Sequence, residues 1–122
     1  MTEVEVVGQD LSGLGWTIKS LMDENLKNPF VGDKVGKISG SLVVRETGAD
    51  VAVTVFFERG RYRIQDGAVA RPSAYLAAGF EQLSELTSGQ VGPIKALLTG
   101  RIKAGGNLLK LLRMARAVIT RE

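Results

Sequence analysis

The sequence predicts a mixed α/β domain in which helices cover one face of a mainly antiparallel sheet. Between residues 37 and 65, apolar residues recur at every second position, which is the period of a half-buried strand. On either side of this stretch, over residues 11–27 and 73–87, apolar residues recur at helical spacing. The predicted strands would form a sheet with one apolar face, and that face needs a cover that the helices can provide.

The composition limits the chemistry that the chain can carry out. We expect one domain over residues 1–122, because a chain of this length buries roughly two thirds of its unfolded surface. The sequence contains no cysteine and no histidine, which excludes disulfides, zinc sites built from these residues and serine–histidine catalysis. Sixteen basic and thirteen acidic residues give a net charge of +3. This excess is a weak indication of nucleic-acid binding, and we expect no nucleic-acid partner.

The first third of the chain predicts one helix followed by a loop. Residues 1–8 are either a tail or a short edge strand, and Asp10 or Ser12 can cap a helix that runs to about Lys27. The sequence Asn28-Pro29 should end that helix, and we expect a loop over residues 30–36. The amino terminus does not resemble a secretory signal, and no apolar run approaches the roughly 20 residues of a membrane span. We therefore expect a cytoplasmic protein.

The middle of the chain predicts a three-stranded antiparallel meander. The strands begin near residues 37, 51 and 61, with turns at residues 47–50 and 59–60. Gly60 can take the positive φ that a tight reversal needs. The alternation places Tyr62 and Ile64 on the inward side of the third strand.

The remainder predicts a brief strand, two helices, another strand and a terminal helix. The brief strand covers residues 68–70, and a long helix over residues 73–87 follows from the spacing of Leu76, Phe80, Leu83 and Leu86. A short helix should begin at Gly92-Pro93 and end near residue 98. A strand over residues 100–105 should precede an apolar terminal helix. Asn107 is expected to cap that helix rather than to form part of a phosphate-binding loop.

This order of elements, with the motif before the terminal helix, resembles the sterol carrier protein type 2 domain. Members of that family typically show Gly-Lys-apolar-Lys-x-x-Gly-Asp/Asn at this place. Here the matching residues are Gly100, Arg101, Ile102, Lys103, Gly106 and Asn107, with Arg101 as a basic variant. The resemblance extends from about Leu11 to Ile119.

The resemblance implies a five-stranded mixed sheet covered on one face by helices, with an apolar tunnel between the two layers. It also implies binding of sterols, fatty acids, fatty acyl-CoA or phospholipids, without cofactors and without catalytic residues. The chain departs from the family in its short, alanine-rich fourth strand and in lacking a peroxisomal-type carboxy-terminal tripeptide. These departures leave sterol specificity and a peroxisomal location without support.

A lipid tunnel needs apolar walls, because burial of each methylene contributes about 0.8 kcal/mol to binding. The alternative is that the same side chains pack against one another as a closed core. The candidate wall residues are Phe56, Phe57, Tyr75, Phe80, Leu83, Leu97, Leu98, Leu108, Leu112 and Met114.

The terminal helix has one broad apolar face, with Lys110, Arg113 and Arg116 on its opposite side. Such a helix is typical of contact with an anionic membrane or with phosphates, and it could act as a movable lid. The alternative is a packed helix whose basic side is simply solvated.

Catalysis has little support in this sequence. Glu81 and Glu85 lie one helical turn apart, on the side of the predicted helix that faces solvent. A second function class is an accessory module that partners an enzyme of lipid metabolism, with the terminal helix docking on a protein. The sequence leaves a monomer and a homodimer open.

Overall fold

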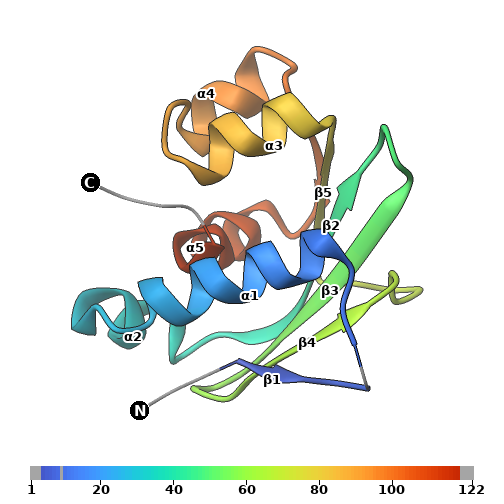
Figure 1. Cartoon of the computed structure of the whole chain (residues 1–122). Coiled ribbons are helices and arrows are strands. Elements are labelled where there is room, and N and C mark those ends of the chain that lie inside the picture. The colour runs from blue at the N-terminus through green and yellow to red at the C-terminus, as the bar shows by residue number, and fades with distance from the viewer. Residues whose placement is uncertain (1–3, 9, 119–122) are drawn as a thin grey trace.

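The computed structural model describes residues 4–8 and 10–118, and it consists of one mixed sheet with helices packed against it (Figure 1). The strands are β1 (Glu5–Val6), β2 (Ser39–Glu46), β3 (Val51–Glu58), β4 (Tyr62–Asp66), β5 (Ala74–Ala78) and β6 (Lys103–Gly106). The helices are α1 (Gly13–Asn25), α2 (Pro29–Val35), α3 (Phe80–Thr87), α4 (Pro93–Leu98) and α5 (Leu108–Val118). The predicted fold class is confirmed.

The sheet has six strands in the order β1-β4-β3-β2-β5-β6, rather than the five that the resemblance implied. The additional strand is β1, which pairs in parallel with β4 and places Glu5 opposite Arg63. The pairs β2–β3, β3–β4 and β5–β6 are antiparallel, whereas β5 runs parallel to β2. The predicted meander is therefore confirmed, and the sheet is mixed but mainly antiparallel.

The predicted long helix over residues 73–87 is wrong in its first half, and the predicted strand at residues 68–70 is not a strand. Residues 74–78 form β5, in which Ala74 and Leu76 are buried and lie opposite Leu42 and Val44 of β2. Alanine favours helices, but pairing with strands on both sides satisfies the backbone of this segment. The helix begins only at Phe80, after Gly79.

The predicted loop over residues 30–36 is also wrong, because α2 occupies most of it. The Asn28 side chain accepts a 2.9 Å hydrogen bond from the backbone N–H of Phe30, and Pro29 takes the first helical position. The pair that was expected only to end one helix thus also starts the next. Helix α1 is capped by Ser12, whose Oγ accepts from the N–H of Gly15 at 3.2 Å.

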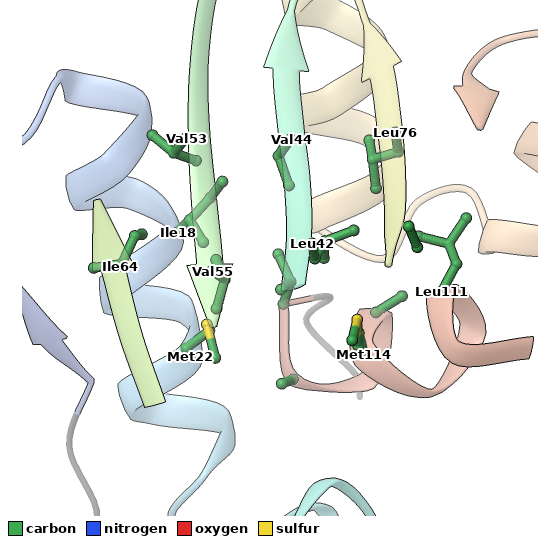
Figure 2. Close-up of a cluster of buried hydrophobic side chains, with 14 of the residues drawn as sticks. Ile18, Met22, Leu42, Val44, Val53, Val55, Ile64, Leu76, Leu111 and Met114 are labelled. Carbon is green, nitrogen blue, oxygen red and sulfur yellow. The ribbon is translucent and has the colours of Figure 1, made fainter. Parts of the chain in front are cut away.

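The core lies between the sheet and the layer formed by α1 and α5 (Figures 1 and 2). Phe57 and Tyr62 are both buried on this side, as expected for Tyr62, and their rings meet edge to face at 5.7 Å. Asn25 of α1 donates a 2.8 Å hydrogen bond to the carbonyl of Ala117, which joins the two helices. The layer of helices is thereby held over one face of the sheet.

Candidate functional site

A cavity of about 610 Å³ lies between α1, β2, α3 and α5, at the end of the molecule near the β2–β3 turn. Its volume falls in the range of about 300–1,000 Å³ that is typical of small-molecule pockets. Most of its wall is apolar. The apolar side chains that line it are Leu14, Ile18, Leu42, Val44, Ala49, Val51, Leu76, Phe80, Leu83, Leu86, Ala115 and Val118.

The hollow exists because large side chains are absent from the stretch of α5 that faces it. Leu111 and Met114 of α5 are buried and fill the space nearer the other end of the sheet (Figure 2). The next inward residues, Ala115 and Val118, are shorter and leave the volume open above Leu42 and Val44. The apolar stripe of α5 and the alternating apolar residues of β2 therefore each supply one wall of the cavity.

The polar part of the cavity lining contains one carboxylate. Glu46 is the last residue of β2 and is only 8% exposed, and its two oxygens accept hydrogen bonds from the N–H groups of Gly48 and Ala49. The hydroxyls of Thr17 and Thr87 also line the cavity. Glu46 was not among the candidate residues predicted from the sequence, although it occupies the next inward position after Leu42 and Val44.

Of the ten candidate wall residues, Phe80 and Leu83 line this cavity. Phe57 and Met114 are almost fully buried in the closed core, and Phe56 lies under the guanidinium of Arg63, with 5.2 Å between the ring centre and Cζ. The others do not line it. Leu97 and Leu112 are half-buried, while Tyr75, Leu98 and Leu108 are exposed.

The wall residues that the sequence did not nominate lie in α1, β2, β3, β5, α3 and α5. Their patterns were visible as apolar stripes, for example Leu14 and Ile18 on α1 and Leu42 and Val44 on β2. Periodicity identifies such residues as inward-facing, but it does not separate those that touch a neighbour from those that face a hollow.

A second depression, here called the basic groove, lies on the other side of α5 and has a volume of about 510 Å³. The three basic residues predicted on the outer side of the terminal helix line it together. Lys34 and Lys37, from the end of α2 and the turn after it, join them, and Asp33 is the one carboxylate in the lining. The lining residues are Asp33, Lys34, Lys37, Ile38, Ser39, Lys110, Arg113 and Arg116.

The first turn of α5 carries specific contacts. Asn107 caps the helix as predicted, because its Oδ1 accepts a 3.0 Å hydrogen bond from the N–H of Lys110. The Lys110 ammonium donates a 2.8 Å hydrogen bond to the carbonyl of Ser39. Helix α5 thus separates the apolar cavity from the basic groove, with a different face toward each.

Two kinds of feature are absent from the part of the chain that the structure describes. Within residues 4–8 and 10–118, no group of three or more acidic, cysteine or histidine side chains is placed to hold a metal ion. Over the same residues, no helix combines the length and the apolar character needed to cross a lipid bilayer.

Comparison with known proteins gives a family match. A family model described as "SCP-2 sterol transfer family" matches residues 18–118. A search of curated proteins found no significant match.

Several solved structures share the fold. The UbiJ-SCP2 ubiquinone synthesis protein superposes with a TM-score of 0.71 at 14% identity, covering 86% of this chain and 92% of that one. Sterol carrier protein 2 from Yarrowia lipolytica, in its apo form, superposes with a TM-score of 0.64 at 14% identity, covering 93% of this chain and 100% of that one. The sterol carrier protein domain 2 of Helicoverpa armigera superposes with a TM-score of 0.60 at 23% identity, covering 94% of this chain and 100% of that one.

Proposed function

The chain belongs to the SCP-2 sterol transfer family, and we propose that it is a non-catalytic carrier that holds an apolar ligand in the cavity between α1, β2, α3 and α5. The ligand classes we propose are fatty acids, fatty acyl-CoA, phospholipids and sterol-like molecules, carried in the cytoplasm by residues 1–122 acting as one lipid-binding domain. The observation that carries the proposal is the apolar cavity of about 610 Å³.

The cavity can supply the binding energy without any reactive group. Each methylene moved from water into the apolar wall contributes about 0.8 kcal/mol. A long hydrocarbon chain would therefore gain on the order of 10 kcal/mol before the entropy of ordering it is subtracted. The net affinity depends on that subtraction, and neither term requires a cofactor or a catalytic residue.

We propose that the basic groove brings the carrier to anionic membrane surfaces. Four of its cations, Lys34, Lys37, Arg113 and Arg116, sit around a single carboxylate, so the groove has a strong positive excess. Each such cation near an anionic surface contributes about 1 kcal/mol. Because α5 lies between the groove and the cavity, membrane contact on one face could move the helix that lines the ligand site.

Loading of the cavity can be tested with a matched pair of variants on α3. Ser84 and Ser88, one turn apart, are both exposed, and only Ser84 lines the cavity. Ser84→Trp should fill part of the hollow and reduce the lipid found by native mass spectrometry, whereas Ser88→Trp should leave loading unchanged. Equal loading of both variants, or wild-type protein that takes up no lipid after incubation with a lipid extract, would contradict the proposal.

Membrane contact can be tested separately with liposomes. Charge reversal of Lys110, Arg113 and Arg116 should weaken binding to vesicles that contain phosphatidylserine at low salt, because the groove would change sign. Binding that is unchanged by these substitutions would remove the groove from the proposal without affecting the cavity.

A second candidate function is an accessory module that partners an enzyme. Large apolar side chains are exposed on α3 and α4, with Phe80 at 73%, Ile94 at 59% and Leu98 at 81%. Such residues are typical of protein contacts, and one structural relative is described as a ubiquinone synthesis protein. Native mass spectrometry separates the two functions, since an empty dimer favours the module and co-purified lipid favours the carrier.

A further inference from the structure

The row of side chains that β2 turns toward the helices ends in a carboxylate where the cavity opens. Leu42, Val44 and Glu46 share this face, and all three line the cavity. We propose, building on the carrier function above, that this end of the cavity selects apolar ligands with a neutral, hydrogen-donating head group, such as an alcohol, over ligands with an anionic head group.

Glu46 is placed as a fixed hydrogen-bond acceptor. Its Oε1 accepts from the N–H of Gly48 at 3.2 Å and its Oε2 from the N–H of Ala49 at 2.5 Å, so the turn after β2 orients both oxygens. Each carboxylate oxygen has a second lone pair that can accept from a ligand. The residue is only 8% exposed, so its charge acts through a poorly solvated rim.

Of the four hydroxyl side chains in the lining (Ser12, Thr17, Ser84 and Thr87), the two threonines already donate within the chain. The Thr17 hydroxyl donates to the carbonyl of Gly13 at 2.9 Å, and the Thr87 hydroxyl donates to the carbonyl of Leu83 at 2.8 Å. A hydroxyl has one proton to donate, so each threonine can only accept from a ligand while these bonds are kept. A ligand hydroxyl can satisfy such acceptors, and a ligand carboxylate cannot.

The start of α1 reaches the same rim, and a helix N-terminus by itself favours an anion. In this chain a carboxylate already occupies that position. Both oxygens of Asp66 lie 2.9 Å from the backbone nitrogen of Ser12, and Asp10 accepts from the N–H of Leu11 at 2.8 Å. These charges offset the positive end of the helix and add to the negative potential of Glu46.

No lysine or arginine among the described residues lines the cavity to balance these charges. The basic side chains of α5 point into the basic groove, on the opposite side of that helix. The anion-binding part of the molecule and the ligand-binding part are therefore separated, and an anionic head group seated at the rim would meet Glu46 without a counter-ion.

The test compares two ligands with the same hydrocarbon chain, dodecanol and dodecanoate. Both would displace the uncharged dye N-phenyl-1-naphthylamine from lipid-free protein at about pH 8, where free carboxylic acids are ionised. Wild-type protein should bind dodecanol at least about tenfold more tightly than dodecanoate, and Glu46→Gln should reduce this ratio to about threefold or less by strengthening dodecanoate binding. Glu24→Gln, which removes one exposed charge on α1 away from the cavity, should keep the wild-type ratio.

The outcomes separate this inference from the carrier function. If neither ligand displaces the dye, the carrier function itself fails and the inference fails with it. If both bind wild-type protein equally, or dodecanoate binds more tightly, the cavity is a carrier site but the selection is refuted. The ratio of dodecanol to dodecanoate affinity is measured on wild-type protein, so the selection is tested even if Glu46→Gln folds poorly. If folded Glu46→Gln keeps the wild-type ratio, Glu46 is not the source of the selection.

Discussion

Replacing Ala115 with leucine should stabilise the ligand-free chain, because the added carbons would enter a hollow. Ala115 lies on α5, is only 4% exposed and lines the cavity. Three added carbons, at about 0.8 kcal/mol each, could contribute about 2.4 kcal/mol when buried. Fixing the leucine rotamer costs about 0.5–1 kcal/mol. The expected net gain in the free energy of unfolding is about 1–2 kcal/mol.

Ala117 provides the matched control on the same helix. It is fully buried and does not line the cavity, and its carbonyl accepts the hydrogen bond from Asn25. Leucine at this position would be forced into a filled core, where overpacking costs about 1–3 kcal/mol. The same substitution, two residues apart, should therefore change stability in opposite directions.

The assay is urea denaturation of lipid-free protein, with dye displacement measured in parallel. Ala115→Leu should raise the urea midpoint and weaken apolar ligand binding by at least about tenfold, because the added side chain competes for the same volume. If Ala115→Leu destabilises the chain as much as Ala117→Leu does, the space between the layers is filled in solution. That result would refute the cavity and, with it, the carrier function.

Three further predictions concern the frame around the site. Gly40→Ala should lower the free energy of unfolding by about 2 kcal/mol or more in urea titrations, because φ is +148° and the new Cβ would lie 2.6 Å from Ser73 Oγ. Gly60→Ala, with φ +94° and open space around the residue, should lower the free energy of unfolding by only about 1 kcal/mol. Equal losses in the two variants would contradict the steric argument. Burial raises the pKa of Tyr62 above 10.0, so the folded state holds the phenol proton more tightly than the unfolded state does. Stability should therefore fall as the pH rises above about 10. A Tyr62→Phe chain that loses as much stability over that range would show that another group is responsible. Phe57→Ala should lower the free energy of unfolding by about 3–5 kcal/mol, and a loss below about 1 kcal/mol would mean that the core repacks around the gap.

The sequence predicted the parts of the fold whose physical cause is local. The meander β2–β4 was predicted from apolar residues at every second position. Helices α1 and α5 were predicted from apolar stripes, with Asp10 or Ser12 as the cap of the first, of which Ser12 is the observed one, and Asn107 as the cap of the second. A cap and a stripe depend on neighbours a few residues away, so one chain displays them directly.

The errors arose where partners distant in the sequence decide the conformation. Residues 74–78 carry helix-favouring alanines, yet they form β5 because β2 and β6 supply backbone partners on both sides. Of the two alternatives for residues 1–8, Glu5 and Val6 form the short edge strand β1, and only its pairing with β4 could not be inferred from its own residues. Helix α2 was missed because Asn28-Pro29 is compatible with both a helix end and a helix start.

By itself, the sequence determined the inward-facing side chains of the meander, the basic side of α5, and the absence of cysteine and histidine. Only the tertiary structure decided which inward side chains surround a hollow, that Lys34 and Lys37 join the basic side of α5, and that Glu46 closes the inward row of β2. The physical reason is that a cavity is a volume left between several elements. Its existence depends on the distance between their backbones as well as on the size of each side chain, and that distance is set by the packing of the whole chain.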